Sequence, residues 1–168
     1  MTARFARHFE ARGRVEAAPR TLFEHLDDPH RLSRHMEQSS MAMMGTRMTL
    51  STDARGGRAP GSVIAMEGRV LGMALALRET VTQREPPLLK AWETLGEPRL
   101  LVIGAYRMGF RIAAEGDGSA LTVFIDYDWP RSAAGQLAGA LFGLAYARWC
   151  CRRMVRDAQQ AFAAAQRL

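Results

Sequence analysis

Lysine is almost missing from this sequence. Lys90 is the only lysine among 23 basic residues, and all the others are arginines. The net charge of +6 admits a nucleic-acid-binding protein, but the arginines are dispersed along the chain and are not interleaved with aromatic residues. One local cluster, between Arg148 and Arg156, is typical of the solvated end of a helix. We therefore expect no nucleic-acid partner.

Cysteine is nearly absent as well. The two cysteines, Cys150 and Cys151, are adjacent in a segment that we predict to be helical, where neighbouring side chains diverge by about 100°. They are poorly placed to bridge each other, so we expect reduced thiols and a cytoplasmic location. Residues 1–14 contain scattered arginines and no continuous apolar stretch with a cleavage site, and we expect no signal peptide.

Long apolar runs are missing too. The most apolar segment lies within residues 132–168, where Gln136 and Arg148 interrupt it. A membrane-spanning helix needs about 20 predominantly apolar residues in succession. We therefore expect no stable insertion into a membrane.

Recognised metal and catalytic motifs are also absent. The histidines are His8, His25, His30 and His35, and their spacing fits neither two ligands at i and i+4 on one helix nor a familiar zinc pattern. No Ser-His-Asp or Cys-His grouping can be read from the sequence. The two cysteines are interpreted as inert helix-packing residues, because an activated thiol needs a positive and partly exposed environment. We expect neither a metal nor a cofactor.

What is present fits one globular domain spanning residues 1–168. The 48% hydrophobic and 24% charged composition is ordinary for a chain that buries a core. Alternating residues over 4–16 predict a half-buried strand. Pro19 then opens a short helix that stops at Asp27, and Asp28 with Pro29 predicts the start of a second, which runs to about Met36.

Residues 36–48 are polar and rich in methionine. They are interpreted as a loop with core fillers, or as a surface that repacks around apolar shapes, because the methionine side chain is unbranched and adaptable. The next part of the chain predicts six strands joined by turns rich in glycine and proline. These strands lie at about residues 48–51, 64–70, 73–82, 88–95, 102–112 and 121–128.

The chain ends in one long predicted helix, residues 132–168, with apolar residues spaced at three and four. Its first half is apolar nearly all round, so we expect it to be buried on more than one side or against a partner. Gly135, Gly139 and Gly143 form a ridge of small residues on it. This ridge favours close packing of the helix on the sheet or space for a ligand; the alternative is a homodimer through paired helices.

The order of elements resembles the START-related, birch-allergen-like helix-grip superfamily (SRPBCC), which includes polyketide cyclases and lipid-transport proteins. Three segments carry the resemblance: VEAAPRTLFEHLDDPHRLSRHM at 15–36, VTQREPPLLKAW at 81–92 and LTVFIDYDWP at 121–130. The resemblance covers essentially the whole chain. It implies an α+β helix-grip fold, β-α-α-β6-α, in which a strongly curved antiparallel sheet grips the C-terminal helix around a deep cavity.

The inward stripes of the predicted strands and helix become the wall of that cavity. The residues expected to line it are Ile64, Met66, Met73, Leu75, Leu77, Tyr106, Met108, Phe110, Val123, Ile125, Tyr127, Leu137, Leu141 and Leu144. Polar groups interrupt these stripes at Arg7, Glu79, Tyr106 and Tyr127. Arg7, Glu79 and Tyr106 are the candidate catalytic residues. Arg7 and Glu79 are expected to pair across the sheet, to contact the polar end of a ligand, or to reach water near strand ends.

Three functions fit this sequence. The first is binding or transport of a hydrophobic small molecule, such as a lipid, a quinone or a polyketide-like compound, because the wall is apolar and rich in methionine. The second is a cyclase or dehydratase-like enzyme that moves protons with Glu79, Tyr106 or Arg7. The third is an interaction module, in which the apolar first half of the long helix and the methionine-rich loop contact a protein partner or a membrane surface. The fold is shared by all three classes, so the sequence favours binding without excluding catalysis.

Overall fold

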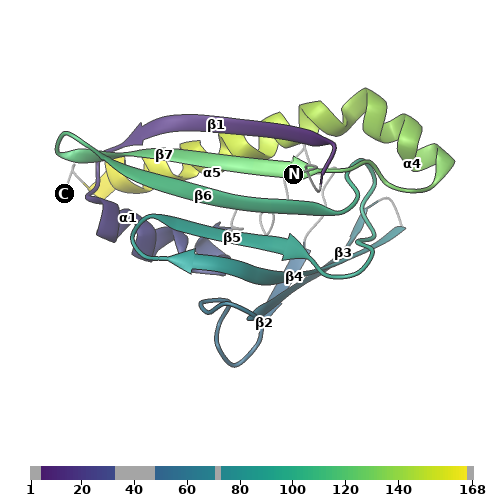
Figure 1. Cartoon of the computed structure of the whole chain (residues 1–168), viewed down its shortest axis with the longest axis horizontal. Helices are drawn as coiled ribbons and strands as arrows, with labels where there is room; N and C mark the ends of the chain where they lie inside the picture. The colour runs from purple at the N-terminus through teal and green to yellow at the C-terminus, as the bar shows by residue number, and fades with distance from the viewer. Residues whose placement is uncertain (1–4, 33–47, 71–72, 166–168) are drawn as a thin grey trace.

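A seven-stranded antiparallel sheet packs against one long helical segment in the computed structural model, which describes residues 5–32, 48–70 and 73–165 (Figure 1). The strands follow the order β1-β7-β6-β5-β4-β3-β2. Their bounds are β1 Arg7–Val15, β2 Met48–Thr52, β3 Val63–Val70, β4 Met73–Glu85, β5 Leu89–Thr94, β6 Tyr106–Glu115 and β7 Gly118–Tyr127. The helices are α1 Pro19–Leu26, α2 Pro29–Leu32, α4 Ala133–Ala138 and α5 Leu144–Ala165, with a π-helical turn, Gly139–Gly143, joining the last two.

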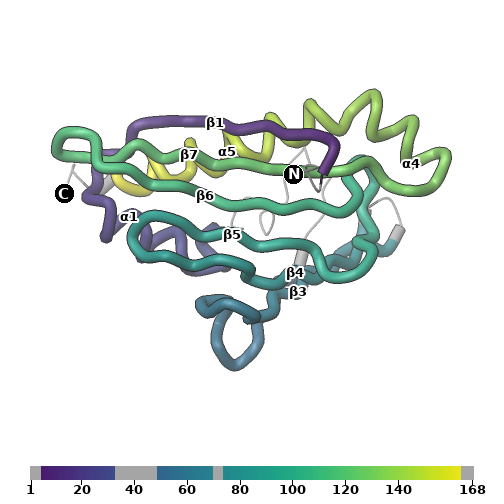
Figure 2. The backbone as a smooth tube through the Cα atoms, viewed as in Figure 1, coloured from purple at the N-terminus to yellow at the C-terminus, as the bar shows by residue number. Residues whose placement is uncertain are grey.

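The first strand and the last strand of the chain are neighbours in the sheet. β1 pairs with β7 over its whole length, from Arg7 opposite Tyr127 to Val15 opposite Ser119. All other pairings join strands that are consecutive along the chain, as a meander requires. Figure 2 follows this path from β1 at the top of the view down through β7, β6, β5 and β4, with α5 behind the sheet. The expected α+β helix-grip fold with a long C-terminal helix is confirmed.

The second half of the helix lies directly on β1 and β7. Val155 and Cys151 are buried in the core, and Gly13 of β1 has no side chain to hold the helix away. A Cβ placed on Gly13 would meet Val155 Cγ1 at 2.6 Å, and the Gln159 amide donates a hydrogen bond to the backbone oxygen of Arg14 at 2.9 Å. The absence of a side chain at residue 13 therefore sets how closely the sheet and helix approach.

The glycine ridge packs within the chain. A Cβ on Gly139 would lie 2.7 Å from the Trp129 ring, one on Gly135 would lie 2.5 Å from Pro130 Cβ, and Gly143 faces the backbone of Val102. The ridge does pack closely, but its contact surface is the Trp129–Pro130 segment and the loop before β6, whereas packing on the strands of the sheet was expected. These glycines are consequently covered and do not form an open groove for a second helix.

The structure differs from the predicted strand at residues 102–112, because β6 begins only at Tyr106. Arg99 donates a backbone hydrogen bond to Ala76, and Gly104 donates one to Asp128. Trp129 O would be 2.6 Å from a Cβ on Gly104. Residues 99–105 therefore form an irregular part of the connection from β5 to β6, hydrogen bonded to β4 and to Asp128 just after β7. The end of the second short helix beyond Leu32, and the methionine-rich segment as far as residue 47, lie outside the described residues.

Among the described residues, no helix is both long enough and apolar enough to cross a membrane.

Candidate functional site

A small cavity of about 60 Å³ lies between the concave face of the sheet and α5. Its wall combines strands β3 to β7, the start of α2, the loop before β6 and one face of α5. The described residues that line it are Pro29, Leu32, Ile64, Met66, Leu77, Glu79, Lys90, Trp92, Leu100, Ile103, Tyr106, Met108, Ile125, Tyr146, Cys150 and Met154. This volume holds a few water molecules, and is smaller than the roughly 300–1,000 Å³ typical of pockets for drug-sized ligands.

Six of the predicted lining residues lie on this wall: Ile64, Met66, Leu77, Tyr106, Met108 and Ile125. Three more, Phe110, Val123 and Tyr127, are buried in the core instead of lining the cavity. Leu75 is half-buried and packs against the core. Met73 belongs to β4, but its side chain lies outside the described part of the structure.

The predicted lining residues on the first part of the helix were wrong. Leu137 and Leu141 are each 64% exposed and Leu144 is 46% exposed, so none of them faces the cavity. The glycine ridge takes the inward face there. In the π-helical turn that follows, residues four positions apart align on one face better than they do in an α-helix. The buried residues Gly135, Gly139 and Gly143 therefore form one continuous row that leads into α5.

The helix residues that do line the cavity are Tyr146, Cys150 and Met154. They are spaced by four, so they form one stripe along the helix, different from the predicted stripe of Leu137, Leu141 and Leu144. Trp92 also lines the cavity, although the sequence alone does not orient it, because both faces of its strand carry apolar residues. Lys90, two residues before Trp92, lies on the same face of β5 by the period of two.

The polar centre of the cavity is a carboxyl group. Glu79 is 3% exposed, and Tyr106 donates a hydrogen bond from its hydroxyl to Glu79 Oε1. Burial raises the pKa of Glu79 to about 7, although hydrogen bonds donated by Tyr106 and by the Trp92 indole lower it in part. The Glu79 carboxyl can therefore gain or lose a proton near neutral pH inside an apolar wall.

Two further titratable groups lie close to this pair on α5. Burial, and secondarily the nearby Glu79, raises the pKa of the Cys150 thiol to about 12. Burial also raises the pKa of the Tyr146 hydroxyl above its ordinary value. Both groups remain protonated at neutral pH, and Cys150 is not a thiolate nucleophile in this environment.

Arg7 is not part of this centre. Its guanidinium lies 3.4 Å from the centroid of the Trp129 ring, a cation–π contact, beside a separate surface recess that Asp128 and Gln136 also line. Arg7 therefore does not pair with Glu79. It is the first residue of β1, near a strand end as the alternative prediction has it, whereas Glu79 is buried and does not reach water. An inward stripe on β1 and one on β4 belong to opposite parts of the sheet, because three strands, β7, β6 and β5, lie between them in the order.

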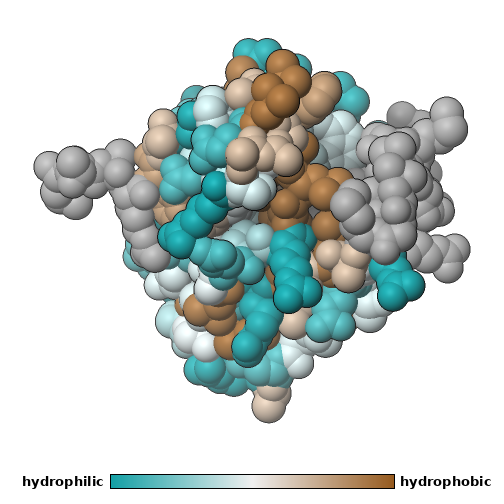
Figure 3. Space-filling view, turned by 90° about the vertical axis from the view of Figure 1, so that its right-hand side faces the viewer, coloured by the Kyte–Doolittle hydropathy of each residue, from teal (hydrophilic) through white to brown (hydrophobic). Residues whose placement is uncertain are grey.

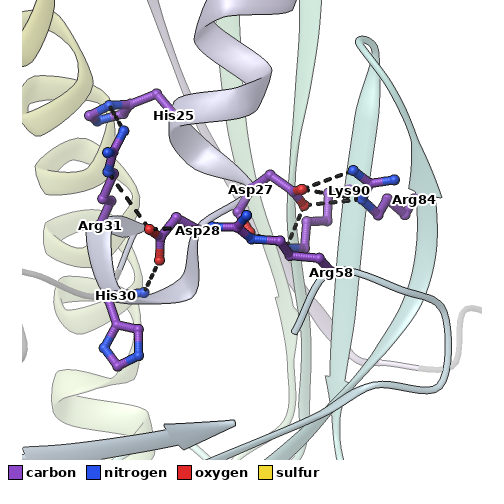
Figure 4. A network of polar contacts seen from close by, with 8 residues as sticks. All are labelled: His25, Asp27, Asp28, His30, Arg31, Arg58, Arg84 and Lys90. Carbon is purple, nitrogen blue, oxygen red and sulfur yellow. Dashed lines mark hydrogen bonds and ion pairs between the residues drawn. The ribbon is translucent and has the colours of Figure 1, made fainter. Parts of the chain in front are cut away.

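A buried ionic cluster joins the C-terminal end of α1 to β4 and β5 (Figure 4), and its member Lys90 also lines the cavity. The Lys90 ammonium, 1% exposed as a side chain, donates hydrogen bonds to the backbone oxygen and to Oδ1 of Asp27, both at 2.8 Å. Arg84 Nη2 donates to Asp27 Oδ2 at 2.9 Å. Burial raises the pKa of Asp27, but the hydrogen bonds from Arg84 and Lys90 outweigh this effect and lower it overall. Asp27 is therefore an ionised carboxylate shared by two cations.

The same cluster joins the short helices to the sheet. Asp28 accepts a hydrogen bond from the backbone N–H of His30 at 3.0 Å, as expected of the residue that begins the second short helix. Arg58, from the loop before β3, lies 3.5 Å from Asp28 Oδ2, and Arg31 lies 3.7 Å from it (Figure 4). The Asp28–Arg58 pair ties the start of α2 to the loop before β3, and Pro29 and Leu32 of α2 line the cavity.

Sequence reasoning missed the Asp27–Lys90–Arg84 cluster. A single lysine in a chain that otherwise uses arginine was the available signal, since it marks a position that differs from the general composition. Within the described residues, no group of three or more histidine, cysteine, aspartate or glutamate side chains gathers as metal ligands would.

Comparison of the sequence with known families and with curated proteins gives no match. Solved structures do match. TTHA0849 from Thermus thermophilus aligns over 95% of this chain and 99% of its own, with a TM-score of 0.68 and 13% sequence identity. Ginseng major latex-like protein 151 from Panax ginseng aligns over 93% and 97%, with a TM-score of 0.56 and 13% identity.

A third structure is the di-domain ARO/CYC StfQ from the steffimycin biosynthetic pathway. It aligns over 95% of this chain and 51% of its own, with a TM-score of 0.62 and 13% identity. Sequence identity this low demonstrates a shared fold and leaves the activity of the chain to its own residues. The resemblance to the helix-grip proteins is thus confirmed for the fold.

Proposed function

Because the chain has the helix-grip fold, we propose that it binds a small hydrophobic molecule in the cavity between the sheet and α5. The observation that carries this proposal is a mainly apolar wall that includes the hydrogen-bonded pair of Glu79 and Tyr106, with the ion-paired Lys90 as another buried ionisable group on it. An apolar ligand gains free energy by leaving water, and a single polar pair fixes its orientation. A lipid, a quinone or a polyketide-like compound has this chemistry.

The small volume makes a specific demand on such a ligand. A molecule larger than a few water molecules enters only if the lining side chains change rotamer. Met66, Met108 and Met154 supply this adaptability, because unbranched thioethers repack around different shapes at low cost. The ligand should therefore shift these methionines before it shifts the backbone.

Native mass spectrometry of the freshly purified protein tests the proposal, followed by methionine-methyl NMR with decanoic acid, a short-chain ubiquinone and an anthraquinone as probes. We expect a copurified compound, or saturable methyl shifts with at least one probe. Leu77→Phe, which fills the cavity, should weaken binding, whereas Leu88→Phe, at an exposed turn, should not. No copurified compound together with no saturable shift would contradict the proposal.

A second candidate function is proton transfer on a bound polyketide-like substrate. One observation favours it: the pKa of Glu79 is about 7, the range in which a carboxyl group serves as general acid or base, and Tyr106 holds its proton beside it. The likeness to a structure described as an ARO/CYC agrees with a cyclase of this kind.

Catalysis and binding are separable by one substitution. Glu79→Gln keeps the shape of the site but removes its titratable proton. In a cyclase, this change should slow the cyclisation of a poly-β-ketone substrate about 10²–10⁴-fold and leave the affinity for the substrate unchanged, as expected for the loss of a general acid or base. A binding protein would show no cyclisation above the uncatalysed rate in either form.

A further inference from the structure

Four large apolar side chains point to solvent from the first part of the C-terminal helical segment. Leu137 and Leu141 are 64% exposed, Phe142 is 58% exposed and Leu144 is 46% exposed, and we call this set the apolar face. Figure 3 shows hydrophobic residues gathered at the top of the end view, where Figure 1 places α4. Contiguous exposed apolar surface of this kind marks an interaction site.

The helix cannot turn to hide this face against its own sheet. Gly135 and Gly139 lie on the opposite side, with Pro130 and the Trp129 ring packed where their side chains would be. Rotation would drive leucine or phenylalanine into the space that these glycines leave for Trp129. The apolar face is therefore a fixed feature of the folded chain.

The positive charge of this helical segment indicates an anionic partner. Residues 129–156 contain five arginines and no aspartate or glutamate. Arg148 and Arg152 follow Leu144 at successive intervals of four, so they continue its side of the helix. Both are exposed, and of the arginines from Arg148 to Arg156 only Arg153 forms an ion pair with a described residue, with Asp157 at 2.9 Å.

We propose that this surface docks on an anionic lipid membrane. The apolar face would enter the boundary between headgroups and acyl chains, and Arg148 and Arg152 would contact lipid phosphates. An amphipathic helix with leucine and phenylalanine on one part and arginine on the other is the usual form of such a peripheral contact. A protein partner with an apolar groove would need acidic side chains to match these arginines, whereas an anionic bilayer offers both features at once.

The docking surface lies beside the wall of the cavity. The loop at residues 100–103 carries Leu100 and Ile103 on the cavity wall and Leu101, 41% exposed, on the outside. The same loop contacts the helix where a Cβ on Gly143 would lie 3.2 Å from Val102 O. A docked molecule would thus hold this part of the cavity wall next to the lipid. The docking itself does not require that the cavity be occupied.

Vesicle flotation tests the proposal with the intact chain. We expect the protein to float with vesicles of phosphatidylcholine and phosphatidylglycerol, to remain largely free with phosphatidylcholine alone, and to be released by added salt, because salt screens charges at the surface. Failure of the wild-type protein to float with the anionic vesicles would overturn the proposal.

Two pairs of variants separate the apolar and charged parts of the surface. Leu141→Glu with Phe142→Glu should weaken partitioning by at least about tenfold, since both side chains lose favourable transfer from water. The matched control is Leu88→Glu, at a position that is 55% exposed in the turn between β4 and β5, and it should bind as the wild type does. An equal loss in this control would contradict a specific docking face.

Arg148→Glu with Arg152→Glu should abolish the preference for anionic vesicles. Arg12→Glu with Arg20→Glu changes the net charge by the same amount on β1 and α1, and should keep most of the preference. Light scattering covers the competing occupant, a second copy of the chain. If the wild type is a dimer that the Leu141→Glu and Phe142→Glu changes convert to a monomer, and neither form floats, the face is a homodimer interface and the lipid proposal is wrong.

Discussion

Glu79 and Tyr106 are hydrogen bonded although a complete strand lies between them. Glu79 is on β4 and Tyr106 is on β6, and β5 separates the two in the sheet. At about 4.8 Å between neighbouring strands, their backbones are roughly 10 Å apart. Two long side chains on the concave face meet above β5, whose Trp92 lines the same cavity. The curved sheet thus brings side chains from three neighbouring strands together at one polar centre.

The raised pKa of Glu79 predicts a pH-dependent stability. The folded protein binds this proton up to about pH 7, whereas the unfolded chain releases it near 4.5. The folded state therefore holds more protons between these values, and the free energy of unfolding should fall as the pH rises through that window, by about 2–3 kcal/mol between pH 5 and pH 8. Urea unfolding of wild type and Glu79→Gln at both pH values measures this effect.

The comparison between the two proteins removes other titrating groups from this measurement. Glu79→Gln carries no titratable proton at this position, so its own pH dependence should be smaller by that same amount. Identical pH dependence in the two proteins would mean that Glu79 has an ordinary pKa.

Removing the Tyr106 hydroxyl should raise the pKa of Glu79 further. The hydroxyl donates to the carboxylate and so favours its charged form, which means that Tyr106→Phe shifts the pKa upward from about 7. Carboxyl ¹³C NMR of labelled glutamate follows this titration. Tyr146→Phe is the matched control, since Tyr146 lines the same cavity and forms no described hydrogen bond with Glu79. A pKa that stays the same or falls in Tyr106→Phe would contradict the hydrogen-bond assignment.

The Asp27 cluster should be costly to break. Asp27→Ala leaves the Lys90 ammonium buried without its carboxylate, and we expect the free energy of unfolding to fall by about 3–5 kcal/mol. Asp27→Leu together with Lys90→Met should cost less than the sum of the two single changes, because no charge is then left unpaired between them. Arg20→Met breaks an exposed pair with Glu24 and should cost about 0–1 kcal/mol. Similar losses for Asp27→Ala and Arg20→Met would show that the cluster is not effectively buried.

Because Lys90 is the only lysine, its chemical reactivity reports on the same cluster. An amine-reactive acetylating reagent should leave the Lys90 peptide unmodified in the folded protein and modify it after unfolding in urea, since the ammonium is buried and hydrogen bonded. Mass spectrometry of the digested protein measures this. Rapid modification of Lys90 under native conditions would contradict the burial of its side chain.

The glycine ridge predicts a position-specific effect on stability. Gly139→Ala places a methyl group against the Trp129 ring at 2.7 Å, and this overpacking should lower the free energy of unfolding by about 1–3 kcal/mol despite the better helix propensity of alanine. The next residue, Ala140, is exposed, and Ala140→Ser should change stability by less than about 0.5 kcal/mol. Stabilisation by Gly139→Ala, measured by thermal unfolding, would mean that Trp129 gives way without cost.

The periodicity of the sequence determined most of the fold. A period of two in the strands, prolines and glycines at the turns, and an alanine-rich segment spaced at three and four predict one strand, two short helices, six strands and a helix, as the structure has them. Periodicity also placed Ile64, Met66, Leu77 and Met108 on the inner face, because alternation along a strand has only two possible faces.

Only the tertiary structure decided which inner-face residues meet. Periodicity cannot distinguish the cavity wall from the solid core, so Phe110 and Val123 were grouped with Met108. It also cannot show which face of the first part of the helix is buried. The glycine face is the buried one because Trp129 packs against it, and Leu137 therefore faces solvent. Tyr106, Glu79 and Lys90 acquire their properties from burial and from partners distant in the chain, and burial of this kind is a property of the packed sheet and helix.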